Sequence, residues 1–318
     1  MMKLEDIKVV ASLGTGTMGY GITLLYAMNG YTVRMFGRSD DSVNRGLTNI
    51  KAALEMYKNH DLVKEDEIPE ILGRITGVTT IKEATEGCDF VIEAIAEDLE
   101  VKRKVWKEIE DYVGPDIIFA TSTSGLSPTE IQEVLVHPER FVVAHFWNPP
   151  HLVPLVEVVP GKQTSQEVVD ITWKLIEKIG KKPVALKREA LGFIGNRLQL
   201  ALLREAIYIV EEGIATPEAV DDAVKYSIGR RLGATGPIET ADLGGLDIFY
   251  NISTYLYEDL CATKEPQKLM ADCVAAGTLG AKTGTGMYQW TPEALSAIKQ
   301  RREEILLEFL QKDKTTKF

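Results

Sequence analysis

Three glycines between an apolar run and a helical pattern constrain the fold of this chain more than any other feature. Residues 7–13 (IKVVASL) predict a short buried strand, and residues 14–19 read GTGTMG. A helical pattern follows over residues 17–29, closed by Gly30, and residues 31–36 (YTVRMF) predict a second strand. The spacing G-x-G-x-x-G inside a strand–helix–strand unit is typical of a turn whose backbone approaches a phosphate closely.

Each glycine of this turn has a separate physical task. Gly14 permits the tight turn, Gly16 lets the backbone approach a pyrophosphate, and Gly19 lets the helix pack closely on the strand. The free N–H groups at the start of the helix, at Thr17 and Met18, then point toward the phosphates. The segment therefore predicts a dinucleotide site, and the alternative is a glycine-rich turn without a ligand.

The end of the second strand bears on which dinucleotide is bound. NAD sites commonly place Asp or Glu there to bind the ribose 2′-hydroxyl. This chain has Gly37 and Arg38 instead, and no carboxylate before Asp40. The missing acid removes repulsion against a 2′-phosphate, and an arginine is able to pair with one. We expect NAD(P), with NADP slightly favoured; the alternative is that Arg38 is a surface arginine at a turn.

Strand and helix patterns alternate through the first 187 residues, which predicts an α/β fold with a mostly parallel sheet. Ligands of such sheets bind beyond the carboxyl ends of the strands. Polar groups from several predicted strands meet at that edge, and Ser122 is assigned to the cofactor site on this ground. The groups are the glycine turn, Glu97, Ser122, Ser124 and His145.

Residues 141–159 carry the strongest candidate for chemistry. An apolar run leads to His145, the segment 148–150 (NPP) interrupts it, and a second apolar run carries Glu157. Because the prolines exclude a helix, the stretch predicts strand, turn and strand. A histidine with a carboxylate on the next strand is the arrangement of a general base and its orienting acid. The alternative is a core histidine satisfied by the backbone and a glutamate at a strand edge.

The remainder of the chain has a different character, because strand patterns stop after Lys187. We expect a dinucleotide-binding domain over residues 1–187 and an all-helical domain over residues 188–318. The long apolar helix predicted over residues 192–212 is of the kind that packs against another domain or subunit. A homodimer through the helical domain is therefore expected.

Composition excludes several classes of protein. Asp plus Glu number 47 against 36 for Lys plus Arg, and the net charge of −11 argues against nucleic acid as a general partner. The three cysteines show no metal-binding spacing and favour a reducing compartment. No signal peptide and no apolar run long enough for a membrane are recognised. We expect a cytoplasmic protein without a membrane partner.

Eight segments agree in sequence and order with the 3-hydroxyacyl-CoA dehydrogenase family, which the chain resembles over about residues 7–290. They are the glycine turn, EAIAED, TSTSGLS, AHFWNPP, LVEVVPG, GFIGNR, GPIETADLGGLD and TGTGMY. The resemblance implies a Rossmann domain followed by an all-α dimerisation domain, with the active site in the cleft between them. It also implies an oxidoreductase that transfers a hydride between a 3-hydroxyacyl substrate and a nicotinamide cofactor.

The resemblance implies roles for individual residues. His145 corresponds to the general base and Glu157 to the acid that orients it, while Ser124 and Asn196 match the groups that bind the reacting oxygen of the substrate. Hydride chemistry belongs to the cofactor, so no metal is expected. The residues that fall where the family contacts or closes over the cofactor are Glu97, Lys102, Asn148 and Lys282.

Departures from the family pattern bear on the substrate. Ala53 and His60 stand where acyl-CoA members can place a Ser and a Lys on CoA, and Gly37 replaces the family's Asp at the ribose position. The sequence PPHLVPLVEV and the final segment, residues 291–318, are more similar to gulonate and carnitine dehydrogenases, which oxidise small free acids. The length of the helical insert after the second strand, however, is typical of acyl-CoA members.

These features leave three functions open. We expect a 3-hydroxyacyl-CoA such as 3-hydroxybutyryl-CoA as the substrate, within fatty acid metabolism, slightly ahead of a small free 3-hydroxy acid. The third alternative is a non-catalytic dinucleotide-binding relative. Such a protein would tolerate the loss of His145 or Glu157, and both residues are present.

Overall fold

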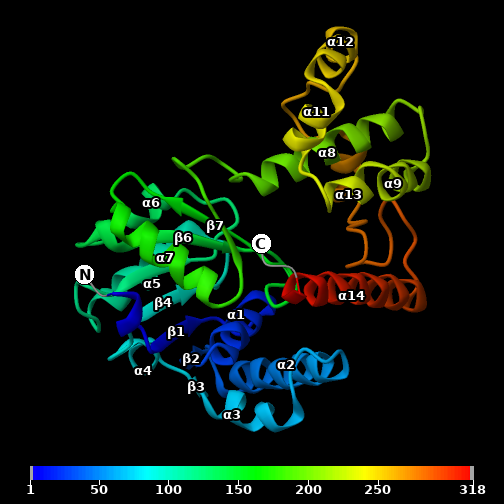
Figure 1. The fold of residues 1–318 in the computed structure, drawn as a ribbon. Helices are drawn as coiled ribbons and strands as arrows, with labels where there is room; N and C mark the ends of the chain where they lie inside the picture. The colour runs from blue at the N-terminus through cyan, green and yellow to red at the C-terminus, as the bar shows by residue number, and fades with distance from the viewer. Residues whose placement is uncertain (1–2, 316–318) are drawn as a thin grey trace. The chain divides into compact units, whose positions relative to one another are not determined.

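The computed structural model describes residues 3–315, which form two compact units (Figure 1). One unit contains the chain up to Asn196 and again from Arg302 onward. The other unit is Arg197–Arg301.

A sheet of eight strands forms the centre of the first unit. Its strand order is β3-β2-β1-β4-β5-β6-β7-β8, and every neighbouring pair is parallel except β6 with β7. The strands are β1 (Val9–Leu13), β2 (Thr32–Phe36), β3 (Ile75–Val78), β4 (Phe90–Glu93), β5 (Ile118–Thr121), β6 (Phe141–Phe146), β7 (Leu155–Pro160) and β8 (Lys182–Ala185). The predicted α/β fold with a mostly parallel sheet is confirmed. The strand order reverses between β1 and β4, and such switch points are where α/β sheets bind ligands.

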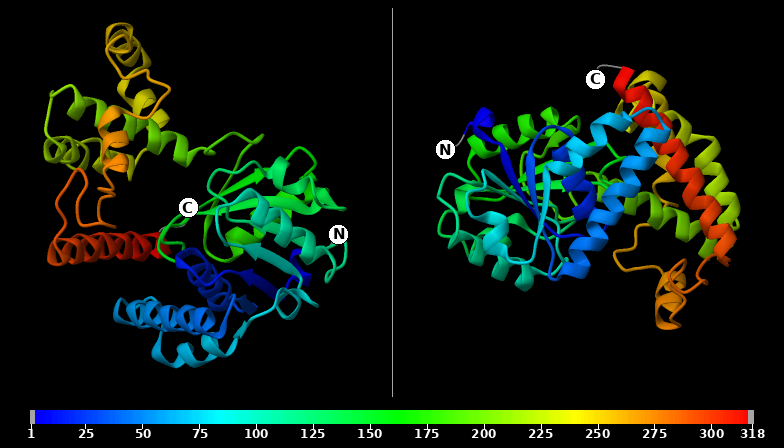
Figure 2. Two further views of the ribbon diagram at one scale, coloured as in Figure 1. Left: turned by 180° about the vertical axis from the view of Figure 1, so that it is seen from behind. Right: turned by 90° about the horizontal axis from the view of Figure 1, so that it is seen from below.

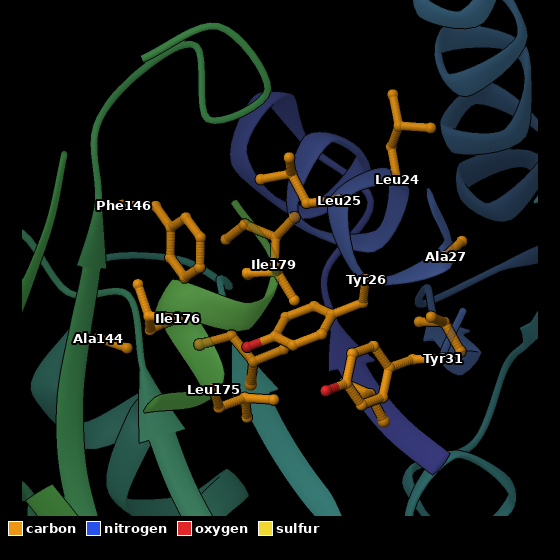
Figure 3. Packing of buried hydrophobic residues seen from close by; sticks show 14 of the residues in the cluster. Leu24, Leu25, Tyr26, Ala27, Tyr31, Ala144, Phe146, Leu175, Ile176 and Ile179 are labelled. Carbon is orange, nitrogen blue, oxygen red and sulfur yellow. The ribbon is translucent and has the colours of Figure 1, made fainter. Parts of the chain in front are cut away.

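Helices pack against the sheet in two separate hydrophobic clusters, and the helical layers can be followed in Figure 2. The first cluster includes α1 (Thr17–Met28), α2 (Asp40–Asn59), α3 (Ile68–Gly73) and α7 (Gln166–Lys178). The second includes α4 (Ile81–Thr85), α5 (Leu99–Glu110) and α6 (Pro128–Gln132). Figure 3 shows side chains of the first cluster meeting from α1, β6 and α7, among them Tyr26, Phe146 and Leu175. Strands buried on both faces in this way need the nearly continuous apolar runs that the sequence has.

The second unit is built from helices, as predicted. They are α8 (Gly195–Glu211), α9 (Pro217–Tyr226), α10 (Ile228–Leu232), α11 (Pro237–Gly244), α12 (Leu246–Leu256), α13 (Lys268–Ala275) and the first part of α14 (Pro292–Thr315). Between α13 and α14 the residues described here form only isolated bridges, Gly280 with Thr285 and Thr285 with Gln289. None of the helices between residues 3 and 315 is long and apolar enough to span a membrane.

The last part of α14 belongs to the first unit. Leu306, Leu307 and Leu310 pack into or against the first hydrophobic cluster, and Leu307 is buried. Gln311 Nε2 donates a hydrogen bond of 2.7 Å to the carbonyl of His60, at the end of α2. The compact units therefore differ from the expected division at residue 187: residues 188–196 and the end of the chain join the first unit, because their side chains pack there.

Candidate active site

The glycine turn after β1 has the geometry that a dinucleotide needs. Gly14 has a φ of +125°, and a Cβ at this position would lie 2.5 Å from the carbonyl oxygen of Ala94, so only glycine fits. A Cβ on Gly19 would lie 2.1 Å from the carbonyl oxygen of Gly14, which shows how closely α1 packs on the turn. A Cβ on Gly16, the N-cap of α1, would meet no atom within 4 Å. The helix N-terminus therefore faces open space that suits a pyrophosphate.

Close packing requires a glycine at residue 37, directly after β2. It is buried, and a Cβ would lie 2.5 Å from Ser42 Oγ and 2.9 Å from Val43 Cγ2, both in the first turns of α2. The neighbouring Arg38 is exposed just before α2 begins. Close packing of α2 against the strand end therefore accounts for the missing carboxylate at least as directly as a preference for a 2′-phosphate does.

His145 and Glu157 form a buried pair on neighbouring strands. The antiparallel register of β6 and β7 places the two residues directly opposite each other, so their side chains lie on the same face of the sheet. His145 Nδ1 lies 2.9 Å from Glu157 Oε2, and the two residues are 4% and 0% exposed. The predicted order of strand, turn and strand is present. A histidine hydrogen-bonded to a buried carboxylate in this way is suited to act as a general base.

The Glu157 carboxylate has three further donors. Trp147 Nε1 donates to Oε2 at 3.1 Å, while the backbone N–H groups of Ile194 and Gly195 donate to Oε1 at 2.8 and 3.0 Å. Burial alone would raise the pKa of this carboxyl, but the hydrogen bonds from His145, Gly195, Ile194 and Trp147 outweigh burial and hold its pKa below the ordinary value. Glu157 is thus an anion near neutral pH although it is buried.

Two aromatic rings flank the imidazole of His145. The ring centroids of Trp147 and Phe193 lie 5.7 and 5.5 Å from that of His145, both tilted. Phe193 is buried and has a φ of +52°, a backbone conformation that is costly for an aromatic residue. The ring of His145 is therefore held in one orientation by packing as well as by Glu157.

Ser124 lies after β5, with its backbone held on both sides. Its N–H donates to Glu97 Oε1 at 2.8 Å, and its carbonyl accepts a 2.8 Å hydrogen bond from Asn196 Nδ2. Ser122 contacts the end of β6, because its Oγ accepts a hydrogen bond of 3.3 Å from the N–H of Phe146. The structure thus brings the predicted residues Ser122, Ser124, Glu97 and Asn196 together near one end of the sheet.

The structure also describes three other residues expected at the cofactor, and their role there stays a prediction. Lys102 is 1% exposed and contacts Glu93, a buried carboxylate on β4 that the sequence analysis did not single out. Asn148 precedes a cis proline in the turn between β6 and β7. Lys282 belongs to the second unit, in the segment between α13 and α14.

Sequence reasoning missed two side chains of this site. Trp147 follows His145 by two residues, but its sequence position gives no sign that its N–H reaches Glu157. Glu93 was detectable in principle, because an acid in the apolar stretch DFVIEAI requires a partner when the strand is buried. Among residues 3–315 no group of three or more His, Cys, Asp or Glu side chains is arranged to hold a metal ion.

Comparison with known proteins agrees with this geometry. Residues 9–190 match the 3-hydroxyacyl-CoA dehydrogenase, NAD binding domain, and residues 192–290 match the 3-hydroxyacyl-CoA dehydrogenase, C-terminal domain. A probable 3-hydroxybutyryl-CoA dehydrogenase of Bacillus subtilis is 37% identical over 286 residues, 90% of this chain and 98% of the relative. An L-carnitine dehydrogenase of Oceanobacillus iheyensis is 38% identical over 239 residues, 75% of this chain and 76% of the relative.

A solved structure extends the likeness to almost the whole chain. The crystal structure of a 5-formyl-3-hydroxy-2-methylpyridine 4-carboxylic acid 5-dehydrogenase, described as an NAD+-dependent dismutase, superposes with a TM-score of 0.90. It is 32% identical and the match covers 97% of this chain and 99% of that one. With the glycine turn and the two matched domains in place, the chain belongs to the 3-hydroxyacyl-CoA dehydrogenase family and is an NAD-binding oxidoreductase of that family.

Proposed function

We propose that the protein oxidises a secondary alcohol of a 3-hydroxy substrate to a ketone, or runs the reverse reaction, with His145 as the general base. The observation that carries this proposal is the 2.9 Å contact between His145 Nδ1 and Glu157 Oε2. Because Glu157 is an anion, His145 donates its Nδ1 hydrogen to it, and Nε2 is left as the proton acceptor. Nε2 then takes the hydroxyl proton of the substrate, and Glu157 stabilises the imidazolium that forms.

The cofactor site in this proposal is the glycine turn at the N-terminus of α1. Gly14, Gly16 and Gly19 would let the backbone and the helix end hold the pyrophosphate. NAD, when bound, supplies the centre that accepts or returns the hydride. The exposed side chain of Arg38 is available to a 2′-phosphate, so the proposal includes measurable binding of NADP as well.

Ser124 and Asn196 are proposed to hold the reacting oxygen. Ser124 is exposed, and Asn196 uses one N–H of its amide on the Ser124 carbonyl, which leaves the second N–H for a substrate. Two donors aimed at the same oxygen stabilise the charge that develops on it as the proton leaves.

For the substrate we propose a small free hydroxy acid ahead of an acyl-CoA. Ala53 is buried in the first hydrophobic cluster, and His60, which caps the end of α2, binds Met56 O through Nδ1 at 2.8 Å. The end of α14 then packs onto the same region, through Leu307 and the hydrogen bond from Gln311. The positions that would contact CoA by resemblance are thus occupied by the protein itself. The relative matched over 97% of this chain is also named for a pyridine carboxylic acid.

An acyl-CoA remains the second candidate, and two observations favour it. The Bacillus subtilis relative is named as a probable 3-hydroxybutyryl-CoA dehydrogenase and matches 90% of this chain. The helical insert between β2 and β3, which contains α2 and α3, is also as long as the resemblance expects for acyl-CoA members. In that case the reaction would belong to fatty acid metabolism.

A substrate panel tests both candidates. Purified protein is assayed with 3-hydroxybutyryl-CoA and with a set of free 3-hydroxy acids, each with NAD and with NADP. The absorbance of the reduced nicotinamide measures the rate. We expect the highest kcat/KM for a free acid with NAD. A higher kcat/KM for the CoA ester would reverse the order of the two substrates, and no turnover with any member would contradict the proposed reaction.

We also propose that the protein is a homodimer formed through the second unit. Large apolar side chains on α8 and α12 are exposed within that unit, a feature typical of surfaces that pack against another chain. They include Leu198, Leu200, Leu202, Phe249, Tyr250 and Ile252. Light scattering at micromolar concentration is expected to give about twice the chain mass, and a monomer would contradict the proposal.

A cytoplasmic location stays a prediction. Cys88, Cys261 and Cys273 are free thiols.

A further inference from the structure

The segment between β8 and α8, residues 186–194, contacts both members of the His145–Glu157 pair, and we call it the linker. The ring of Phe193 lies against His145, with 5.5 Å between the ring centroids. The N–H of Ile194 donates to Oε1 of Glu157 at 2.8 Å. The position of the linker therefore affects the orientation of the imidazole and the hydrogen bonds of the carboxylate.

The backbone of the linker forms a turn that is costly by itself. Gly192 has a φ of +72° and Phe193 has a φ of +52°, which a residue with a side chain rarely adopts. The N–H of Phe193 donates to the carbonyl of Ala190 at 3.0 Å and closes the turn. A conformation of this kind persists only when contacts with the rest of the protein hold it in place. The end of the turn is held by Glu157, so its beginning also needs an anchor.

The half-buried side chain of Glu189 contacts α6 at the beginning of this turn. Its Oε1 accepts the hydroxyl of Thr129 at 2.8 Å, and its Oε2 accepts the hydroxyl of Ser127 at 2.9 Å and the N–H of Thr129 at 3.3 Å. Ser127 is the N-cap of α6, and Thr129 lies in the first turn of that helix. Glu189 therefore attaches the linker to α6 shortly before Gly192.

The two hydroxyl groups that bind Glu189 are themselves held by backbone N–H groups. Thr129 Oγ1 accepts the N–H of Lys162, in the turn between β7 and α7, at 3.0 Å. Ser127 Oγ accepts the N–H of Glu130 at 3.2 Å. Because a backbone N–H can only donate, both hydroxyl hydrogens are left for the carboxylate of Glu189. The anchor is therefore fixed from α6 and from the turn after β7.

We propose that Glu189 is a positioning residue for the His145–Glu157 pair, because it holds the beginning of the turn so that the end of the turn reaches the pair. This inference rests on the proposed role of His145 as the general base. With the anchor in place, the N–H of Ile194 meets the carboxylate of Glu157, and the ring of Phe193 meets the imidazole. Glu189 acts through the backbone of the turn.

The variants remove the anchor from either side. Glu189→Ala deletes the acceptor, and Thr129→Val deletes one donor and keeps a side chain of similar shape. Glu189→Gln is the conservative variant, because its amide oxygen still accepts one hydroxyl. The double variant E189A/T129V should cost about as much as the larger of the two single changes, since both residues act through one contact. Glu177→Ala is the matched control, a glutamate that is exposed on α7.

Four quantities are measured on each full-length variant: the melting temperature, hydrogen exchange of residues 194–195 without substrate, NADH affinity, and kcat and KM across a range of pH. For Glu189→Ala we expect faster exchange and a kcat lowered by about tenfold, since small displacements of catalytic groups cost this much. KM and NADH affinity should each change by less than about twofold. Glu189→Gln should show smaller changes in the same direction, and Glu177→Ala should behave as the unchanged protein.

The pH profile separates positioning from a general loss of stability. The N–H groups at the end of the turn are among the donors that hold the pKa of Glu157 below its ordinary value. The other donors to this carboxylate are Trp147 and His145, and His145, on β6, is the titratable group that contacts it. Weaker N–H contacts should raise the pKa of Glu157, so the activity of Glu189→Ala should fall at a higher pH on the acidic side.

Two outcomes overturn the proposal. Unchanged exchange of residues 194–195 in Glu189→Ala would show that Glu189 does not hold the turn. Faster exchange with unchanged kcat and an unchanged pH midpoint would show that the pair does not depend on the turn, whatever the melting temperature. A failure of the proposed function is seen separately, because His145→Gln would then keep near-normal turnover. The exchange result, measured without substrate, would still report whether Glu189 holds the turn.

Discussion

Trp147 donates its indole N–H to Oε2 of Glu157 at 3.1 Å, the same oxygen that faces His145 Nδ1 at 2.9 Å. Two donors therefore share one carboxylate oxygen. Each hydrogen bond withdraws negative charge from the carboxylate, so Trp147 limits how strongly Glu157 stabilises a protonated imidazole.

Replacement of Trp147 by Phe removes this donor and keeps an aromatic ring beside His145. Because this hydrogen bond is one of those that hold the pKa of Glu157 below its ordinary value, the pKa of Glu157 should rise in the variant. We expect kcat/KM for alcohol oxidation to fall at a higher pH on the acidic side of its profile, with a raised midpoint. Steady-state rates between acidic and alkaline pH measure the shift, and an unchanged midpoint in a variant with an unchanged melting temperature would contradict it.

His145→Gln tests the assignment of the base. The amide cannot take up the hydroxyl proton, so turnover should fall by about 10²- to 10⁴-fold, the usual contribution of a general base. NADH affinity should stay the same, because the glycine turn is not altered. The matched control is His137→Gln, since His137 is half-exposed and its imidazole contacts Glu139 outside the site. Near-normal turnover in His145→Gln would show that the base is another group.

Arg38→Ala tests the discrimination between the two dinucleotides. If Arg38 pairs with a 2′-phosphate, loss of a charge-assisted hydrogen bond should weaken NADPH binding by about tenfold or more and leave NADH binding unchanged. Fluorescence titration with both cofactors measures the two affinities, and equal effects on both would contradict the pairing. Gly37→Asp is a less direct test, because a Cβ at residue 37 would collide with Ser42 and Val43.

The buried His151 predicts a loss of stability in acid. Burial, helped by the nearby positive charge of Lys181, lowers the pKa of His151 to about 4 from 6.5, and its Nδ1 has no hydrogen-bond partner among residues 3–315. Between these two values the unfolded chain binds a proton at His151 and the folded chain does not, so stability falls as the pH falls. The loss should total about 3 kcal/mol from pH 6.5 to pH 4.

Urea unfolding at several pH values measures this slope. His151→Phe keeps a ring in contact with Tyr20 and Tyr57 and removes the titrating group, so its stability should change less over the same pH range. The control His137→Gln should retain the slope of the unchanged protein. A slope that is the same in His151→Phe would mean that other groups cause the acid sensitivity.

Leu307→Ala tests whether the end of α14 is part of the first unit. Leu307 is 1% exposed in the first hydrophobic cluster, so its truncation leaves a cavity and should lower the free energy of unfolding by about 2–5 kcal/mol. The control is Ile305→Ala on the same helix, which is 44% exposed and should cost less than about 1 kcal/mol. Denaturant unfolding gives both values, and equal small effects would contradict the packing.

The parts of the fold that local patterns determine could be predicted from the sequence. Gly14 and Gly19 are required by close backbone contacts, and the prolines around residue 149 force the break between the strands of His145 and Glu157. The sequence signals of these features are residues that are neighbours in the chain, although the contact that excludes a side chain at Gly14 comes from Ala94. They are therefore visible before any tertiary structure is known.

The parts that depend on distant contacts could not be predicted in the same way. Apolar spacing in α14 shows that the helix has a buried face, but not that Leu307 packs with the first unit. The resemblance assigns Lys102 to the cofactor site, which stays a prediction, and the sequence does not show that this lysine contacts the buried carboxylate of Glu93. Whether a long polar side chain points out or in depends on a partner brought near by folding, and the spacing of a motif does not contain that information.

The hydrogen bonds from Ile194 and Gly195 to Glu157 have a consequence for the construction of chimaeric enzymes. These two N–H groups lie immediately before and at the first residue of α8, yet they hold the carboxylate that faces His145. A splice point upstream of Ile194 would replace them with the backbone of a foreign protein. A splice point after Asn196 keeps them, so exchange of the helical unit between relatives should preserve the chemistry only when the junction is placed there.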